Sequence, residues 1–245
     1  MKTNQELDRA AEVSSGWRAA PPLNRAYNVI EVAVFLFLIV PSMALSFFVR
    51  QIGGLAFPYV AVSTMVRDLS LVSLIWFFLW RNGEPLARLG LTWQNGWREV
   101  YLGVALFFPV TFGAGLLENW LRRAGLSTPP AHAPSFLTLH GSGEVALAVL
   151  LVVIVALAEE TIFRGYLLLR FQAVKPGPWA AALLSAVIFS LGHGYEGSAG
   201  VVTVGAMGFV LALIYLWRGS LTGPIIIHFL QDFSSLVLPV LGGGK

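Results

Sequence analysis

Residues 159–164 read Glu-Glu-Thr-Ile-Phe-Arg and lie inside an apolar run that extends from about Val145 to Leu169. A run of this length and composition is typical of a membrane-spanning helix. A charged side chain near the middle of a bilayer costs at least about 2.5 to 3.5 kcal/mol, so an ionisable residue there usually serves a function. Two glutamates and one arginine within six residues therefore indicate a functional site in this helix.

The spacing within this stretch gives its charged residues different surroundings. Glu160 and Arg164 lie four residues apart on one helix face, with the acid N-terminal to the base, the favourable order for an ion pair. Glu159 projects about 100° away from that face, on the stripe that carries Phe163. We therefore expect Glu160 and Arg164 to pair and Glu159 to be available for chemistry. A purely structural role for the ion pair, joining two helices, remains the alternative.

Composition places the chain among multipass membrane proteins. Of its 245 residues, 56% are hydrophobic and 12% are charged, and its mean hydropathy is +0.73. Soluble domains are about a quarter charged, so this chain is too apolar for that class. The net charge of +3 forms no basic patch, which argues against a nucleic-acid partner. The absence of cysteine excludes disulfides, thiolate metal sites and a cysteine nucleophile.

The predicted fold is all-α, a polytopic membrane helix bundle with about seven transmembrane helices, within a range of about six to eight. A polar N-terminal arm, residues 1–26, precedes the bundle and lacks the apolar core of a cleavable signal peptide. Seven apolar segments follow, near residues 28–49, 57–80, 99–120, 145–169, 179–193, 200–217 and 222–240.

Two stretches depart from this simple pattern. Pro58, Arg67 and Asp68 interrupt the second apolar segment, which favours a re-entrant or interfacial stretch that leads into a shorter span. The connection between the third and fourth segments carries Pro129 and Pro130 and is a candidate lid or surface flap.

Two further stretches bring polar groups into the bundle. Residues 189–193 read Phe-Ser-Leu-Gly-His, and residues 228–232 read His-Phe-Leu-Gln-Asp. In each stretch the first and last residues share one helix face. A lone membrane histidine is more often an interhelical hydrogen-bond partner than a catalyst, so the functional interpretation depends on whether these residues meet.

A helix rise of about 1.5 Å per residue places the polar residues at similar depths. Measured from the inner ends of their helices, the depths are about 16 Å for Glu159, 22 Å for His193, 10 Å for His228 and 16 Å for Asp232. All of them fall in the middle band of a hydrocarbon core about 30 Å thick. We therefore expect three helices to converge on one polar site.

The three motifs resemble, in their order along the chain, those of the CPBP family, the CAAX-protease and bacteriocin-processing intramembrane proteases formerly called Abi. The motifs are Glu-Glu-x-x-x-Arg at 159–164, Phe-x-x-x-His at 189–193 and His-x-x-x-Asp at 228–232. The family's last motif ends in Asn or Asp, and this chain has Asp232. The resemblance implies a transmembrane protease domain at residues 27–240 with its catalytic core at 144–240.

The resemblance also implies an activity and a substrate class. Eukaryotic relatives remove the last three residues of a prenylated CAAX terminus, whereas bacterial relatives are linked to bacteriocin self-immunity, maturation or protein secretion. We therefore predict an intramembrane endopeptidase that acts on a membrane-associated substrate, CAAX-like or of bacteriocin or leader type. The predicted location is the plasma (inner) membrane.

Amide hydrolysis needs a base for the attacking water, a stabiliser for the oxyanion and a proton donor for the leaving amine. Glu159, unpaired and removed from bulk water, suits the general base, and His193 would assist it or orient the water. His228 and Asp232 would face the substrate carbonyl, with Asp232 either accepting a hydrogen bond from His228 or donating when protonated.

The remaining motif residues have supporting roles. Arg164 would hold Glu160 in place and brace the helix. Phe189 more often packs than contacts substrate, so it is a weak candidate for substrate binding.

Two mechanisms have been described for the family that this chain resembles. Its members were first described as metalloproteases and later as enzymes in which Glu and His activate water directly. If a divalent metal such as zinc is present, Glu159, His193 and His228 are its candidate ligands. Glu160 would then have to act as the base while paired with Arg164, which suits it poorly. We therefore predict that no cofactor is required.

Other functions fit the sequence less well. It has no His-Glu-x-x-His for a zincin, and Ser142 precedes an apolar helix, where serine is a typical N-cap. A transporter or proton relay would use buried Glu, His and Asp as an ion path, but no internal repeat is visible. A membrane scaffold that binds a partner protein without catalysis is the remaining alternative.

The distribution of Lys and Arg predicts the orientation of the chain. With seven spans and a cytoplasmic N-terminus, ten of these residues flank the inner side and five, Arg67 among them, flank the outer side. The excess of basic residues on the inner side agrees with the positive-inside rule.

This orientation can be tested with single cysteines, because the native chain has none. A membrane-impermeant thiol reagent should label Pro130→Cys in intact cells and Arg88→Cys only after permeabilisation. Labelling of position 130 only after permeabilisation would reverse the topology.

Overall fold

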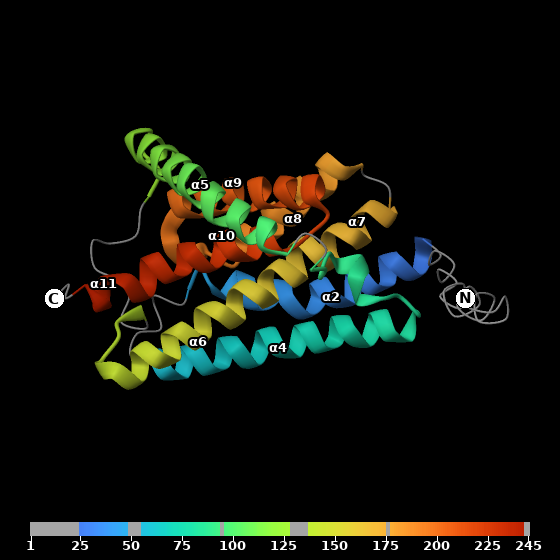
Figure 1. Ribbon diagram of the computed structural model, residues 1–245, viewed down its shortest axis with the longest axis horizontal. Coiled ribbons are helices and arrows are strands. Elements are labelled where there is room, and N and C mark those ends of the chain that lie inside the picture. The colour runs from blue at the N-terminus through green and yellow to red at the C-terminus, as the bar shows by residue number, and fades with distance from the viewer. Residues whose placement is uncertain (1–24, 49–54, 94–95, 128–136, 175–176, 243–245) are drawn as a thin grey trace, which may run out of the picture.

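The computed structural model describes residues 25–48, 55–93, 96–127, 137–174 and 177–242. All regular structure in these ranges is helical, as predicted (Figure 1). Most of the predicted N-terminal arm and the prolines of the predicted lid lie outside the described residues. The helices are α2 (Arg25–Leu45), α4 (Phe57–Arg81), η1 (Leu86–Leu89), α5 (Trp97–Arg123), α6 (Gly141–Glu160), η3 (Thr161–Leu167), α7 (Leu168–Val174), α8 (Pro178–Leu191), η4 (Gly194–Glu196), α9 (Gly197–Arg218), α10 (Thr222–Asp232), η5 (Phe233–Val237) and α11 (Leu238–Leu241).

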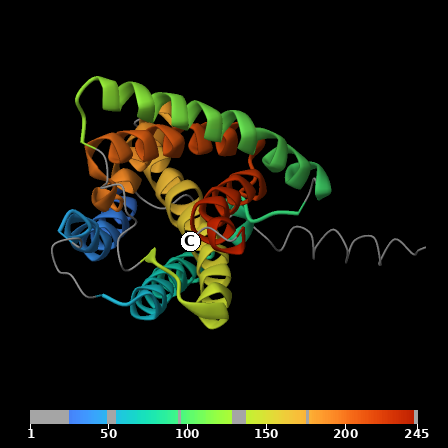
Figure 2. The same ribbon diagram turned by 90° about the vertical axis from the view of Figure 1, so that its left-hand side faces the viewer.

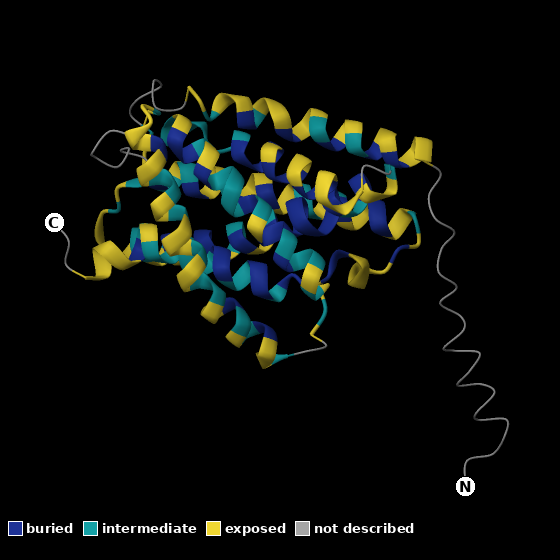
Figure 3. Cartoon of the chain, turned by 90° about the horizontal axis from the view of Figure 1, so that it is seen from above, coloured by how far each residue is buried: buried dark blue, intermediate teal, exposed yellow. Residues whose placement is uncertain are grey.

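Six helical stretches in the described part of the chain are long and apolar enough to cross a membrane. The chain is thus a polytopic membrane helix bundle, and all seven predicted segments are helical. The predicted fifth segment, α8, has only 14 residues, or about 21 Å of helix. Exposed residues cover the outside of the bundle (Figure 3), and many of them are large apolar residues, as a lipid solvent requires. Five tryptophans near helix ends are 65% to 77% exposed, as is typical of an aromatic belt: Trp80, Trp97, Trp120, Trp179 and Trp217.

The second apolar segment differs from the predicted re-entrant or interfacial stretch. It forms one uninterrupted helix, α4, with no re-entrant turn. Pro58 stands in the first turn, where its missing N–H breaks no helical hydrogen bond. Arg67 and Asp68 lie near the middle of α4 and bond to each other, so their charges are accommodated within the span. Arg67 consequently lies within the span, with its side chain 42% exposed, and not in an outer flank.

The helix that carries residues 159–164 runs without a break from α6 into α7 and lies across the other helices (Figure 2). Its middle part, η3, is wound as a π-helix, and all seven of its residues are buried. The wider winding begins immediately after Glu160. A second π-helical segment, η5, begins immediately after Asp232. Such segments are rare and often occur at functional sites.

Close packing holds η3 in the centre of the bundle. A Cβ atom on Gly165 would come within 3.1 Å of the Leu89 carbonyl oxygen, so a larger residue would require η1 to shift by a few tenths of an ångström. Tyr166 is fully buried and packs against Phe35 of α2 with its ring tilted by 54° and the ring centroids 5.1 Å apart. These contacts fix the position of the glutamates that precede η3.

Buried charges join the helix ends near Arg170. The Arg170 guanidinium donates to Glu31 of α2 at 3.0 Å and to Glu84 at 3.1 Å. Arg81, the last residue of α4, also donates to Glu31, at 2.8 Å. Arg170, Glu31 and Glu84 are each less than 10% exposed, so these are desolvated pairs that bind α2 and α4 to α7 at one end of the bundle.

Candidate active site

The centre of the site is a buried ion pair within one helix. Arg164 Nη1 donates to Glu160 Oε1 at 2.7 Å, and the two side chains are 1% and 0% exposed. The predicted pair therefore forms. Arg164 also donates to the Gly208 carbonyl of α9 at 3.2 Å and lies over the ring of Phe189, 4.5 Å from its centroid. The pair thus connects α6, α8 and α9.

Glu160 also orients a histidine from another helix. His228 Nδ1 lies 2.8 Å from Glu160 Oε1, the same oxygen that accepts from Arg164. An ionised carboxylate only accepts hydrogen bonds, so Nδ1 carries the proton. His228 Nε2 therefore faces the other acids, at 3.5 Å from Asp232 Oδ2 and 3.8 Å from Glu159 Oε2. Glu160, rather than Asp232, makes the short contact to the ring.

Glu159 lies at the edge of the buried cluster. Its side chain is 14% exposed, against 0% for Glu160. Its Oε1 lies 3.9 Å from Arg67 Nη2 of α4, so a cation distant in the sequence stands beside it. Its Oε2 has no hydrogen-bond partner among the described residues. This oxygen is therefore a buried acceptor whose hydrogen-bonding position a single water could fill.

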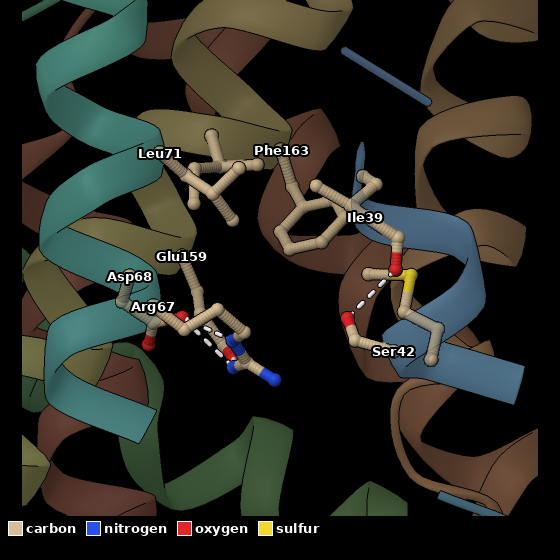
Figure 4. Close-up of a pocket in the computed structure, with 9 residues that line it drawn as sticks. Ile39, Ser42, Arg67, Asp68, Leu71, Glu159 and Phe163 are labelled. Atoms are coloured by element: carbon tan, nitrogen blue, oxygen red, sulfur yellow. Dashed lines mark hydrogen bonds and ion pairs between the residues drawn. The ribbon is translucent and has the colours of Figure 1, made fainter. Parts of the chain in front are cut away.

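A pocket opens beside Glu159 (Figure 4). Its free space suffices for about one water molecule. Figure 4 shows Arg67, Asp68 and Glu159 on one side and Ile39 and Ser42 of α2 on the other. The pocket thus brings a carboxylate pair and one cation against a mainly apolar wall. Its lining residues are Ile39, Ser42, Met43, Arg67, Asp68, Leu71, Glu159, Ile162 and Phe163.

The Phe-x-x-x-His motif contributes a packing residue and a more peripheral histidine. Phe189 packs edge-on against His228, with centroids 6.0 Å apart, and against Phe163 at 5.0 Å. His193 follows the end of α8, 4.9 Å from Phe189 between ring centroids. It lies within Coulombic range of Asp232. In the described part of the chain it makes no hydrogen bond to the other motif residues beyond the Phe189 carbonyl, 3.3 Å from its Nδ1.

Sequence reasoning missed Arg67 and Asp68 as site residues. Asp68 is 1% exposed, and Arg67 lies between it and Glu159. The signal that could have found them is the one that identified residues 159–164, namely charge within an apolar span. Their separation of about 90 residues from Glu159 left no indication in the sequence that the two stretches meet.

The proposed metal ligands do not form a ready-made cluster. Among the described residues, no three or more His, Asp or Glu side chains are arranged so that they could hold a metal ion. Glu159 and His228 approach each other, whereas His193 packs against Phe189, whose ring also contacts His228. We therefore derive no catalytic step through a metal.

The fold and site define a class, an integral membrane protein with an acid–base cluster inside its helix bundle. Residues 141–234 match the family model described as type II CAAX prenyl endopeptidase Rce1-like. This match confirms the resemblance carried by the three motifs and supports a membrane endopeptidase. Comparison with curated proteins and with solved structures gives no match.

The Glu160–Arg164 pair should be required for stability as well as activity. Glu160→Gln and Arg164→Ala each leave a buried charge without its partner, which typically costs about 3 to 5 kcal/mol. Thermal unfolding of the purified variants should show lowered melting temperatures for both. Arg98→Ala is the control, because Arg98 is exposed and its loss should change stability by less than about 1 kcal/mol. Normal melting temperatures for both site variants would refute a stabilising ion pair.

Proposed function

We propose that this protein is an intramembrane endopeptidase in which Glu159 activates water for attack on a peptide bond. The observation that carries the proposal is the position of Glu159 Oε2, which lacks a hydrogen-bond partner in the described structure and faces His228 Nε2 at 3.8 Å. Amide hydrolysis requires a base for the attacking water and a donor for the oxyanion. Glu159 can serve as the base, and His228, held through Nδ1 by Glu160, can serve as the donor.

The proposed reaction begins with a water held between Glu159 and the substrate carbonyl. Glu159 takes one proton from the water as the oxygen bonds to the carbonyl carbon, and the carbonyl oxygen becomes an oxyanion. His228, doubly protonated, donates Nδ1–H to Glu160 and directs Nε2–H toward the oxyanion. Collapse of the intermediate breaks the C–N bond, and Glu159 returns its proton to the leaving amine. The products are a carboxyl group and an amine.

Glu160 and Arg164 act in this scheme by orienting His228. Glu160 Oε1 fixes the ring through Nδ1, and Arg164 in turn fixes Glu160. Asp232 lies on the Nε2 side, where it orients substrate or the imidazolium. His193, near the end of α8, would assist in ordering the water or the leaving group.

The proposed substrate is a membrane-associated peptide or protein. Ile39, Leu71 and Ile162 form an apolar wall beside Glu159, which suits a substrate with apolar residues near the scissile bond. A prenylated CAAX-like end and a bacteriocin or leader peptide both meet this description. We place the protein in the plasma (inner) membrane with a cytoplasmic N-terminus, on the positive-inside argument.

Glu159→Gln should abolish peptide cleavage without disturbing the fold. Glutamine preserves the shape but cannot take the proton from water, so we expect a loss of at least about 100-fold in turnover. Cleavage should be measured with purified protein in liposomes, beside its melting temperature. Glu144→Gln in the first turn of the same helix, about 22 Å away along the axis, is the matched control. Near-wild-type cleavage by Glu159→Gln would eliminate Glu159 as the base.

We also propose that catalysis requires no tightly bound metal. Elemental analysis of active protein should find well under about one zinc per chain, and prolonged chelation should leave cleavage unchanged. Stoichiometric metal, with activity lost on its removal and restored on its return, would decide for a metalloprotease.

A further inference from the structure

Arg67 and Asp68 of α4 form a second charged pair beside the proposed base. Arg67 Nε and Nη2 both bind Asp68 Oδ1, at 2.9 Å and 2.8 Å. Asp68 is buried, whereas the Arg67 side chain is 42% exposed and lines the pocket. The buried aspartate thus holds the arginine in a defined orientation at the pocket wall (Figure 4).

This orientation distinguishes the two oxygens of Glu159. Oε1 faces Arg67 Nη2 at 3.9 Å, whereas Oε2 faces His228 Nε2 at 3.8 Å. Oε2 is also the oxygen without a hydrogen-bond partner in the described residues. Attraction between Arg67 and Oε1 therefore directs Oε2 toward His228, where a base for the attacking water is required.

An anion-binding role for Arg67 agrees less well with its surroundings. Arg67 is one cation against two acids, Asp68 and Glu159, so the three ionised groups sum to about −1. An incoming substrate carboxylate would meet this excess of negative charge. The positive charge of Arg67 is already directed at the protein's own carboxylates.

We propose that Arg67 is a positioning residue for Glu159 and that Asp68 holds Arg67 in place for this task. The inference rests on the proposed function, because it assigns Arg67 an effect on turnover through Glu159. The competing explanation is that Arg67 merely neutralises the buried charge of Asp68. The two explanations predict different behaviour when both residues of the pair are replaced.

The test compares four variants of the full chain in liposomes: Arg67→Gln, Arg67→Lys, Asp68→Asn and the double variant of Arg67→Gln with Asp68→Asn. A library of internally quenched peptides, with and without a prenylated cysteine, serves as substrate. The melting temperature, kcat and KM are measured for each variant. Arg67→Gln should lower kcat about 100-fold, with KM changed less than about threefold, because the base and not the binding pocket is affected. Arg67→Lys retains the charge and should recover at least about tenfold of that loss.

The double variant decides between the explanations. Arg67→Gln alone leaves Asp68 as a buried unpaired charge, so its melting temperature should fall, and adding Asp68→Asn should restore it. Under our proposal kcat stays low in the double variant although its stability returns. Recovery of kcat to within about threefold of wild type would show that Arg67 serves only to neutralise Asp68, and would overturn the proposal.

Two controls separate failure of this inference from failure of the proposed function. Arg218→Gln removes another arginine of the bundle, one that does not line the pocket. Arg218 donates to Glu99 at 2.6 Å, so the variant should lower stability without lowering kcat. Glu159→Gln is assayed beside the wild type. Equal cleavage by these two proteins would overturn the proposed function and this inference with it. If the wild type cleaves, Glu159→Gln does not, and the double variant is as active as the wild type, only the inference is overturned.

Discussion

The structure depends on a single carboxylate oxygen, Oε1 of Glu160, which bonds to both Arg164 and His228. Glu160 is fully buried, and an unpaired charge there would be strongly destabilising. Its two partners come from its own helix and from α10, and Arg164 extends the contacts to Gly208 of α9. The requirement to compensate one buried charge thus sets the relative positions of three helices and the direction of the His228 ring.

The adjacent residue, Glu159, has the opposite character, although the two glutamates share one turn of helix. Its carboxylate lies at the edge of a pocket, 14% exposed, with ion-pair distances near 4 Å to Arg67 and His228. At such distances Arg67 and His228 stabilise the negative charge of Glu159 without forming hydrogen bonds to its oxygens. An acid held by two partners through one oxygen, beside a loosely held acid, is an arrangement suited to general base catalysis. The first acid fixes the geometry of the site, and the second is free to take a proton.

Several features could be predicted from the sequence for identifiable physical reasons. Apolar runs of about 20 residues predict membrane helices because the backbone must satisfy its own hydrogen bonds in lipid. The i,i+4 spacing of Glu160 and Arg164 predicts their ion pair, since both lie on one turn of one helix. Similar depths along three spans predict that their polar residues can meet. The re-entrant interpretation of the second span was wrong, because Pro58 starts the helix and Asp68 finds its partner in Arg67.

The sequence by itself determined the class of fold, the three motifs and the local pairing, because these follow from periodicity and from the cost of charge in lipid. Only the tertiary structure decided that Arg67 and Asp68 stand beside Glu159, that Glu160 and not Asp232 makes the short contact to His228, and that His193 packs against Phe189. The π-helical windings after Glu160 and Asp232 were likewise not predictable. Each depends on how helices distant in the sequence pack, and helical periodicity carries no information about which helices become neighbours.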